Sequence, residues 1–404
     1  MGKKQVPAIR FQGFTDAWEQ RKLGDIYIER NERGNAELDI LSVSIHHGIS
    51  QNELDTDELG KSVRRSDDKS LYKHVYYGDL VFNMMRAWQG AIGVVKNEGM
   101  VSPAYISAIP DDSVFPEFMD YCLRRKCIIN QINNLSYGVT DFRKRLYWEP
   151  FTRVTIMMPS VDEQRKITDI FRQLDDLITL HQCKYEKLLK VKKSMLEKMF
   201  PRDGADVPEI RFDGFTDAWE QRKLSELAEK TYGGGTPTTS NEVFWNGDIP
   251  WIQSSDVVDG KLLGVTPRKH ITQSGLNSSA AQLIPKNSIA IITRVGVGKL
   301  AFMPYSYATS QDFLSLSKLN TEPFFTVYSC YKKLQSELNS VQGTSIKGIT
   351  KDELLSKTIM VPEYAEQQQI GVFFSNLDHL ITLHQRKLEK LKNIKKSLLE
   401  KMFV

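Results

Sequence analysis

The chain contains the same framework twice, and this duplication constrains its fold more than any other feature of the sequence. Residues 7–23 recur at 208–224 with 15 of 17 positions identical, and residues 163–200 recur without a gap at 366–403 with 24 of 38 positions identical. The repeat divides the 404 residues into two parts of roughly 200 residues, each large enough to bury its own core. We therefore expect two copies of one fold.

The stretches that lie between the copied segments have diverged. Residues 24–158 and 225–361 barely resemble each other, although they occupy the same place in the two repeats. A chain that repeats the copied segments but varies the stretches between them can present two different surfaces on the same framework. This organisation is typical of a protein that reads two different targets.

Each copy of the longer segment has the pattern of a long helix that pairs with another helix. Its apolar residues fall on alternating three- and four-residue steps, which is the spacing of a heptad seam. A helix of about 40 residues is about 60 Å long, more than one small domain can cover, so the other copy is the natural partner. The seam includes Leu174, Leu177, His181 and Leu188 in the first copy and Leu377, Leu380, His384 and Leu391 in the second.

The connection between the repeats predicts the direction of the two helices. We expect domains at 1–158 and 208–361, long helices at 159–200 and 362–404, and a linker at 201–207 that contains Pro and Gly. Because the linker is short, the second domain must begin near the far end of the first helix. The second helix then runs back along the first, which gives an antiparallel coiled coil with approximate two-fold symmetry.

Composition and the first residues of the chain favour a reduced, cytoplasmic protein. The net charge of +4 is only mildly basic, and the four cysteines show no zinc-type spacing. No apolar run approaches the ~20 residues of a membrane span. The start, Met1-Gly-Lys-Lys-Gln, lacks the apolar stretch of a signal peptide. A secreted or membrane protein is therefore not expected.

The second divergent region carries loop residues suited to nucleic acid. Thr236 and Thr238 lie in the glycine- and hydroxyl-rich stretch 232–240, which can bring backbone amides and hydroxyls close to phosphates. Arg294 and Lys299 follow an apolar run that predicts a buried strand ending in a basic, glycine-containing turn. Arginine is the side chain that most often reads guanine, while hydroxyls and lysine commonly contact phosphates.

The first divergent region repeats part of this arrangement. Arg86 occupies the place of Arg294 after an apolar run. Each region also ends in a polar, glycine-bearing loop, with Arg143 and Lys144 in the first and Lys347 in the second, and Lys144 aligns with Lys347. Any one of these cations alone is more often a solvated surface residue. Only the recurrence of Arg86 with Arg294 and of Lys144 with Lys347 at matched places favours these four as DNA-binding residues, and Arg143 is a further candidate beside Lys144.

Catalytic and metal-binding patterns are missing from the sequence. Gly298-Lys299 resembles part of a phosphate-binding loop, but Thr293 stands where that loop needs Gly, and Leu300 replaces its Ser or Thr. The sequence has no His-Glu-x-x-His motif and no nucleophile elbow. We therefore expect a chain without catalytic or metal-binding residues.

Two further motifs recur with the framework. A Pro-x-x-x-Glu-Gln block opens each long helix, at 159–164 and 362–367, and a Trp-Glu-Gln-Arg-Lys-Leu segment at 18–23 and 219–224 leads into each divergent region. In this doubled order, the motifs resemble the conserved regions of the specificity subunits of type I restriction-modification systems. The resemblance covers essentially the whole chain.

The resemblance implies a DNA-reading role. Each divergent region would be an α/β (α+β) target-recognition domain for one half of a split, asymmetric site in double-stranded DNA, and the paired helices would set the spacer. Two modification subunits would dock on the helices, bind S-adenosylmethionine and methylate adenine. Two restriction subunits would add a translocase and nuclease that use ATP and Mg. The chain itself would be non-catalytic and would bind no cofactor.

Lysines beside the seam fit such docking, although a solvated helix face gives the same pattern. They are Lys190, Lys192 and Lys193 in the first helix and Lys392, Lys395 and Lys396 in the second.

The alternative function, from another class of protein, is a non-catalytic coiled-coil adaptor that links two protein-binding modules. Salt-dependent DNA affinity would distinguish a DNA-binding protein from such an adaptor. A self-contained DNA methyltransferase is disfavoured because the cofactor loop and the catalytic motif are missing.

Overall fold

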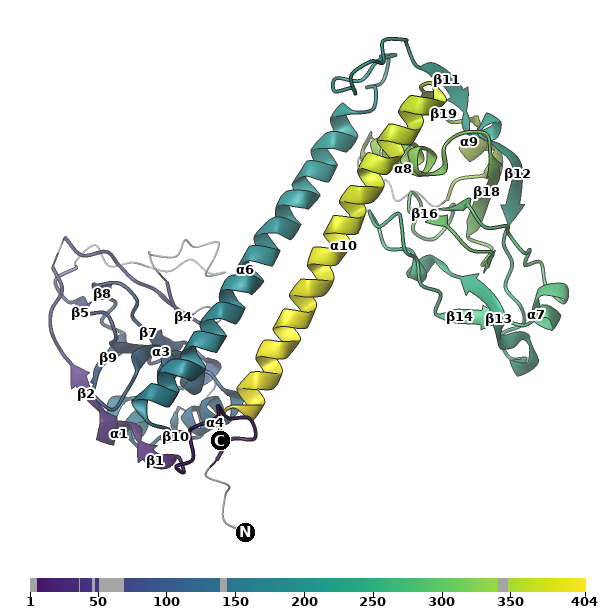
Figure 1. Cartoon of the computed structure of the whole chain (residues 1–404). Helices are drawn as coiled ribbons and strands as arrows, with labels where there is room; N and C mark the ends of the chain where they lie inside the picture. The colour runs from purple at the N-terminus through teal and green to yellow at the C-terminus, as the bar shows by residue number, and fades with distance from the viewer. Residues whose placement is uncertain (1–5, 36, 46–47, 51–68, 139–143, 341–347) are drawn as a thin grey trace. The chain divides into compact units, whose positions relative to one another are not determined.

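The computed structural model describes residues 6–35, 37–45, 48–50, 69–138, 144–340 and 348–404. The chain folds into two compact units: unit 1 comprises Met1–Leu180 and Leu388–Val404, and unit 2 comprises His181–Lys387. Each unit thus contains one divergent region and parts of both long helices (Figure 1). Within the described ranges, no helix is long and apolar enough to cross a membrane.

Unit 1 is a mixed α/β fold. Before its long helix the elements are, in chain order, β1 (Glu19–Lys22), α1 (Leu23–Ile26), β2 (Tyr27–Arg30), β3 (Val43–Ser44), β4 (Gly48–Ile49), β5 (Lys73–Val75), β6 (Leu80–Asn83), the 3₁₀ helix η1 (Ala87–Gln89), β7 (Ile92–Val94), β8 (Gly99–Val101), β9 (Tyr105–Pro110), α3 (Pro116–Leu123), α4 (Lys126–Leu135), α5 (Trp148–Thr152) and β10 (Thr155–Met158).

A four-stranded antiparallel sheet in the order β2-β9-β6-β7 forms the centre of unit 1. Every residue of β6 and β7 is buried, as expected for strands covered on both faces. Helix α3 lies against β7 and adds the fully buried Phe118 and Met119 to the core. Two small sheets, β3-β4 and β5-β8, accompany this central sheet.

Unit 2 is also a mixed α/β fold. Its elements before the second long helix are β11 (Glu220–Lys223), the 3₁₀ helix η3 (Leu224–Glu226), β12 (Ala228–Gly233), η4 (Glu242–Phe244), β13 (Trp245–Ile252), η5 (Ser254–Asp256), β14 (Lys269–Ile271), α7 (Gln273–Asn277), β15 (Ser288–Ile292), β16 (Leu300–Met303), β17 (Ala308–Thr309), β18 (Phe313–Leu319), α8 (Pro323–Ser340), α9 (Lys351–Ser356) and β19 (Thr358–Val361).

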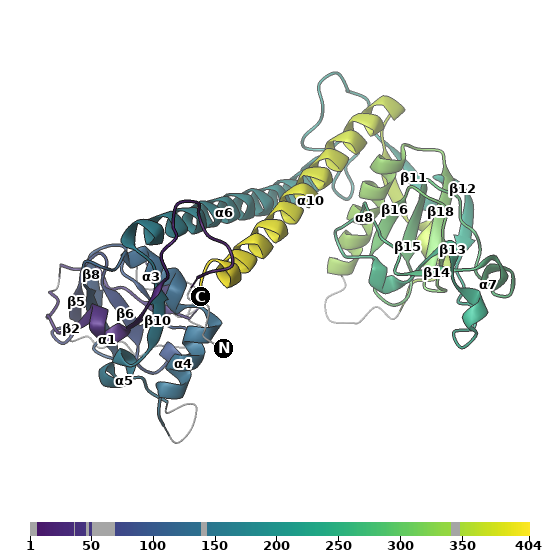
Figure 2. The ribbon, with the colours of Figure 1, turned by 60° about the horizontal axis from the view of Figure 1, so that its bottom comes forward.

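The central sheet of unit 2 has the topology of the sheet in unit 1. Its order is β12-β18-β15-β16, with all neighbours antiparallel, so that β12, β18, β15 and β16 take the places of β2, β9, β6 and β7. A further sheet, β14-β13-β17, lies beside it and pairs β13 with β17 in parallel (Figure 2). Dissimilar sequences therefore build the same central sheet.

The shorter copied segments close each divergent region. Strand β1 pairs with β10, and β11 pairs with β19, in the same antiparallel register. Trp18 and Trp219 precede these strands and are 1% and 3% exposed, so each tryptophan anchors the start of its domain in the core. The end of each divergent region is thereby hydrogen-bonded to its beginning.

The two longest helices in the described part of the chain are α6 (Val161–Lys198) and α10 (Tyr364–Lys401). Each begins two residues after a proline, Pro159 or Pro362, and α6 ends just before Pro201, which cannot continue a helix. The first turn of α6 contains two acidic residues and that of α10 contains one, and each helix has a lysine in its last turn. These charges stabilise the helix ends through the helix dipole.

The helices run antiparallel, as the linker predicted. In unit 1 the start of α6 meets the end of α10, where the ring centroids of Phe171 and Phe403 are 6.0 Å apart. In unit 2 the start of α10 meets the end of α6, where Phe374 lies 5.7 Å from Phe200. The two helices lie side by side in both views (Figures 1 and 2).

The eight seam residues named from the sequence follow the prediction except at two positions. His181 and His384 face each other with 2.8 Å between their Nδ1 atoms. However, Leu177 and Leu380 are 43% and 41% exposed, and the prediction that they fill the seam is wrong. A straight helix has 3.6 residues per turn, so a strict heptad pattern drifts out of the contact. The remaining predicted positions are buried or half-buried, namely Leu174, Leu188, Leu377 and Leu391.

Candidate nucleic-acid interface

The turn between β15 and β16 carries the first candidate cation of unit 2. All of β15 is buried, and the turn begins at the buried Thr293. Gly296 and Gly298 adopt φ values of 92° and 89°, a left-handed conformation that favours glycine. Arg294 is exposed and makes no hydrogen bond or ion pair with any described residue, and the adjacent Val295 is 70% exposed. The turn therefore presents an arginine and an apolar side chain to solvent.

Backbone hydrogen bonds hold two other loops beside this turn. Thr293 N donates to Asp312 O at 2.7 Å, and the Thr293 hydroxyl donates to the same oxygen at 3.0 Å. Ile349 N donates to Thr293 O at 2.7 Å, so the chain that follows Lys347 runs next to the turn. Lys347 itself lies outside the described residues, and Lys299, near the end of the turn, is half-buried.

The glycine-rich stretch reaches the same edge of unit 2. Thr236 Oγ1 donates to Gln311 Oε1 at 2.6 Å. Gln311 directly precedes Asp312, whose carbonyl accepts the hydrogen bonds from Thr293. Thr238 has an exposed side chain, and its carbonyl accepts a hydrogen bond from Trp245 Nε1 at 3.2 Å. The structure thus brings Thr236 close to the turn that carries Arg294.

Two glycines of this stretch have a packing role that we did not predict. A Cβ on Gly234 would lie 1.9 Å from Ser310 O, and a Cβ on Gly235 would lie 2.3 Å from the carbonyl carbon of Ala280. The Gly235 amide also donates to Thr309 O at 2.9 Å. The expectation that these glycines bring free amides to phosphates is therefore wrong for Gly235, because its amide is already bonded within the fold.

In unit 1 the turn between β6 and β7 has the corresponding place in the sheet. Met85 is 45% exposed, and Arg86 follows it as a half-buried residue. Gly90, with φ of 103°, ends the short helix η1 within the turn. Like its counterpart in unit 2, the turn carries an arginine beside an exposed apolar side chain.

A second loop also lies beside this turn, as it does in unit 2. Leu146 N donates to Met84 O at 2.8 Å. This hydrogen bond corresponds to the one from Ile349 N to Thr293 O in unit 2. Lys144 is half-buried, with its Nζ 5.4 Å from the ring centre of Trp88 in η1. Arg143 lies outside the described residues. Arg86 and Lys144 therefore belong to adjacent loops.

The surface of unit 1 around this loop is aromatic. Tyr137 and Tyr147 stack with ring centroids 5.3 Å apart and are 60% and 37% exposed. Tyr137 is bridged through its backbone to Arg145, so the two ends of the loop are held together. The aromatic pair has no sequence counterpart in unit 2, which explains why we did not predict it.

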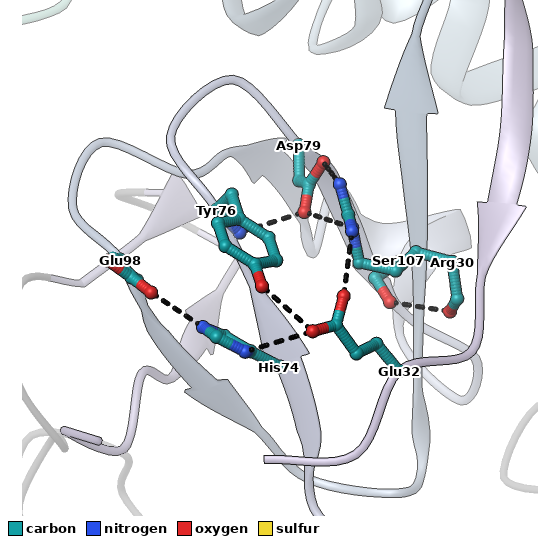
Figure 3. Close-up of polar contacts among 7 residues, drawn as sticks. All are labelled: Arg30, Glu32, His74, Tyr76, Asp79, Glu98 and Ser107. Atoms are coloured by element: carbon teal, nitrogen blue, oxygen red, sulfur yellow. Dashed lines mark hydrogen bonds and ion pairs between the residues drawn. The ribbon is translucent and has the colours of Figure 1, made fainter. Parts of the chain in front are cut away.

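At the opposite end of β6 a polar network ties the strands of unit 1 together (Figure 3). Arg30 Nε lies 2.7 Å from Asp79 Oδ2, and burial raises the pKa of the Asp79 carboxyl even beside this cation. His74 Nε2 lies 2.8 Å from Glu98 Oε1, while its Nδ1 faces Glu32 at 3.4 Å. No group of three metal-ligating side chains occurs in the described part of the chain.

The copied segments form buried ion pairs that we did not assign from the sequence. Arg10 makes two hydrogen bonds to Glu163, at 2.7 and 2.8 Å, and Arg211 makes two to Glu366, both at 2.8 Å. Both glutamates are at most 1% exposed. The adjacent glutamine of each block is also buried and bonds backbone groups of its own divergent region. The identical copies contained this signal, since all four charged residues lie at matched positions.

Two of the lysines expected to be exposed for docking are not. Lys192 is 6% exposed and pairs with Asp378, and the half-buried Lys395 pairs with Asp175. That expectation was wrong because each lysine finds its partner on the helix of the other repeat. The remaining four lysines are exposed, namely Lys190, Lys193, Lys392 and Lys396.

The fold is that of a duplicated protein: each mixed α/β unit contains a central four-stranded antiparallel sheet of the same strand order and parts of both long helices. Residues 16–190 and 216–393 each match the model of the type I restriction modification DNA specificity domain. Because these matches span most of the chain, the chain belongs to that family and contains its domain twice.

Several relatives have similar sequences. The chain is 28% identical over 193 residues to the type I restriction enzyme MjaIX specificity subunit of Methanocaldococcus jannaschii, covering 46% of this chain and 44% of that relative. It is 31% identical over 169 residues to the EcoR124I/EcoR124II specificity subunit of Escherichia coli, covering 40% and 41%. Both alignments thus span less than half of the relative. A putative MjaX specificity subunit from M. jannaschii is 21% identical over 405 residues, covering 95% and 92%.

The fold is similar to solved structures of the same kind of protein. The S subunit of a type I restriction-modification system from M. genitalium superposes with a TM-score of 0.62 and 14% identity, and the alignment covers 99% of both chains. A structure that describes complex assembly in the type I R-M system superposes with a TM-score of 0.51 and 20% identity, covering 97% and 99%. These likenesses confirm the predicted fold class.

Proposed function

We propose that this chain is the DNA specificity subunit of a type I restriction-modification enzyme, in which units 1 and 2 each read one half of a bipartite, asymmetric site. The observation that supports this most strongly is the duplicated pair of loops. In both units, dissimilar sequences place a turn at the same end of the same four-stranded sheet, between β6 and β7 or between β15 and β16. A second loop is hydrogen-bonded to that turn in both units. A protein that reads two different half-sites needs one scaffold with two different surfaces.

The side chains on these loops suit a DNA groove. Arg294 has its guanidinium donors available for a guanine edge or a phosphate, and Thr236 with Gln311 adds hydroxyl and amide groups. In unit 1, Arg86 and Lys144 accompany an aromatic surface instead. Because the two surfaces differ in chemistry, the two half-sites should differ in sequence.

The long helices would set the spacer and dock the partner subunits. Four leucines at matched positions of α6 and α10 remain 38% to 46% exposed, namely Leu177, Leu180, Leu380 and Leu383. Exposed apolar clusters are typical of protein-binding surfaces. Two equivalent clusters would take two modification subunits, which bind S-adenosylmethionine. Two restriction subunits that use ATP and Mg would complete the enzyme, and the chain itself is its non-catalytic subunit.

Mapping adenine methylation in cells that express this chain with its modification subunits tests the proposal. We expect methylation at one bipartite, asymmetric site with a fixed spacer. Arg294→Ala should weaken discrimination at one half-site by about 1–3 kcal/mol, and Arg86→Ala should do so at the other. Arg222→Ala removes an exposed arginine from β11 and should leave both half-sites unchanged.

The outcomes separate this function from its alternative. Equal loss at both half-sites in Arg294→Ala would contradict the assignment of unit 2 to a single half-site. A coiled-coil adaptor between protein-binding modules would direct no methylation. Such an adaptor would also lack the steep fall in DNA affinity with salt that several phosphate contacts produce.

A further inference from the structure

Each unit contains a cluster, buried in unit 2 and half-buried in unit 1, in which a tyrosine, an aspartate and a lysine meet from three different helices. In unit 2, Lys192 Nζ lies 2.5 Å from Asp378 Oδ1, and the Tyr328 hydroxyl donates to Asp378 Oδ2 at 2.6 Å. The same ammonium donates to Gly260 O at 3.0 Å and lies 5.5 Å from the centre of the tyrosine ring. We call this cluster clasp 2.

Unit 1 contains the matching cluster, clasp 1. Lys395 Nζ lies 2.5 Å from Asp175 Oδ1, and the Tyr121 hydroxyl donates to Asp175 Oδ2 at 2.9 Å. The ammonium lies 5.4 Å from the centre of the tyrosine ring. The tyrosine comes from α3 of the divergent region, as the tyrosine of clasp 2 comes from α8. The same three side chains therefore occur in both units, and both tyrosine helices begin with a Pro-x-Phe-x-x-Tyr segment, at 116–121 and 323–328.

The lysine of each clasp comes from the other repeat. In clasp 2 the tyrosine and the aspartate belong to the second repeat, whereas Lys192 belongs to the first. In clasp 1 the tyrosine and the aspartate belong to the first repeat, and Lys395 belongs to the second. The antiparallel helices cause this exchange, because the end of each helix meets the start of the other. Each recognition domain is thus completed by a side chain from the opposite half of the sequence.

The lysine is the charge that offsets the carboxylate of each clasp. Burial, with the neighbouring carboxylate adding to it, raises the pKa of both Tyr121 and Tyr328, so each tyrosine stays a neutral donor. Removing one partner of a buried ion pair leaves an uncompensated charge, which is strongly unfavourable. Without the lysine, we expect the aspartate carboxylate to move toward water. The helix that carries the tyrosine should then shift as well, because the tyrosine hydroxyl is hydrogen-bonded to that carboxylate.

We propose that each recognition domain is held in its reading orientation by a lysine of the opposite repeat: Lys192 positions the domain of unit 2, and Lys395 positions the domain of unit 1. This inference rests on the proposed function. Both lysines are positioning residues that act through the tyrosine helices α8 and α3. A change in the first repeat therefore alters the readout of the half-site that belongs to the second, and the reverse holds.

The test uses the full chain with its modification subunits and compares methylation of the intact site with that of sites substituted in one half. Lys192→Met should relax discrimination at the half-site of unit 2 by about tenfold and leave that of unit 1 unchanged. Lys395→Met should do the reverse. Its effect should be smaller, because the lysine and aspartate side chains are 27% and 38% exposed in clasp 1 but only 8% and 11% exposed in clasp 2.

Neighbouring lysines provide matched controls. Lys187→Met and Lys390→Met remove the same charge at an exposed, matched position of each helix and should leave both half-sites unchanged. Removing both charges of clasp 2, with Lys192→Met and Asp378→Asn together, should restore the discrimination that Lys192→Met alone reduces, because no charge is then left uncompensated and the asparagine Oδ1 can still accept from the Tyr328 hydroxyl. If Lys192→Met alone yields no methylated DNA, recovery of methylation in the paired variant still tests the inference.

A readout without DNA separates this inference from the proposed function. In the isolated chain, Lys192→Met should speed amide hydrogen exchange in α8 and leave α3 unchanged, and Lys395→Met should give the opposite pattern. A wild-type chain that directs no bipartite methylation would contradict the proposed function, while the exchange pattern would still test the clasps. The inference is overturned by loss at the half-site of the lysine's own repeat, by equal loss at both half-sites, by no change in either readout, or by failure of the paired neutral variant to restore discrimination.

Discussion

The two divergent regions share little sequence, yet they form the same central sheet and hold the same two loops at one edge of it. They agree most closely where the copied segments touch them. The strands of each copied start pair with the end of the divergent region in one register, and each long helix begins with a glutamate bonded to an arginine of that start. The framework therefore dictates how a divergent region begins and ends.

The units differ in what surrounds the central sheet. Unit 1 adds the sheets β3-β4 and β5-β8 and exposes stacked tyrosines, whereas unit 2 adds the sheet β14-β13-β17 with an edge-to-face pair of tryptophans, Trp245 and Trp251. Matched changes at framework contacts of the same geometry should therefore have similar effects in the two units, whereas a change in the added parts has no counterpart in the other unit. Each of the following predictions tests this contrast.

The largest effect is expected at the arginine–glutamate pairs of the framework. Arg10→Ala and Arg211→Ala each leave a glutamate that is at most 1% exposed without its cation. Breaking a buried ion pair in this way should lower the free energy of unfolding by about 3–5 kcal/mol. Because the two pairs have the same geometry, the losses should be similar, and urea unfolding of the two variants would measure them.

An exposed arginine serves as the control for this comparison. Arg222 pairs with Glu220 at the surface, where the two side chains are 42% and 71% exposed. Arg222→Ala should therefore change the free energy of unfolding by less than about 1 kcal/mol. A loss confined to one of the two buried pairs would show that the framework is not equivalent in the two units.

The framework could be predicted from sequence because its signals are local and repeated. The helix blocks, the short linker and the heptad steps fix two antiparallel helices without any knowledge of the divergent regions. The buried run before Arg294 and its counterpart before Arg86 likewise predicted two matched strand-and-turn units. These features depend on burial and periodicity, which a single sequence reveals.

The remaining features depend on contacts between distant segments. Lys192 has the sequence surroundings of a solvated helix face, and only the arrival of α10 and α8 beside it turns it into a buried cation. Gly234 is similar, since the backbone of Ser310 that excludes a side chain there is far away in sequence. Periodicity carries no information about such encounters, so neither residue could be assigned before the fold was known.

Gly234→Ala should produce an intermediate effect confined to unit 2. The added Cβ would lie 1.9 Å from Ser310 O, so the glycine loop must move away from its neighbour. Overpacking of this kind typically destabilises a fold by about 1–3 kcal/mol. Methylation assays should show weaker discrimination at the half-site of unit 2 alone, and urea unfolding should show the loss of stability.

The adjacent glycine is the matched control. A Cβ on Gly233 would meet nothing within 4 Å, so Gly233→Ala should leave stability and both half-sites close to wild type. Equal behaviour of the two variants would mean that the loop tolerates displacement. The close approach to Ser310 would then not be what requires a glycine at position 234.

The smallest effect is expected where the two copies of one residue face each other. Burial, and then the neighbouring His384, lower the pKa of His181, and the cations of Lys387 and Lys184 act in the same direction. Well above the ordinary histidine pKa of about 6.5, the imidazole is neutral in both the folded and the unfolded chain. As the pH falls below that value, the unfolded chain takes up the proton first, so the free energy of unfolding should decrease.

Thermal unfolding between pH 7.5 and pH 5.5 would isolate this contribution when wild type is compared with His181→Gln/His384→Gln. The wild type should lose more stability on acidification, because glutamine pairs do not titrate. His379→Gln removes an exposed histidine of the same helix and should keep the wild-type slope. If the double variant also keeps the wild-type slope, the pair tolerates protonation. The contact between His181 and His384 would then behave like a solvent-exposed contact, unlike the buried contacts of the framework on either side of it.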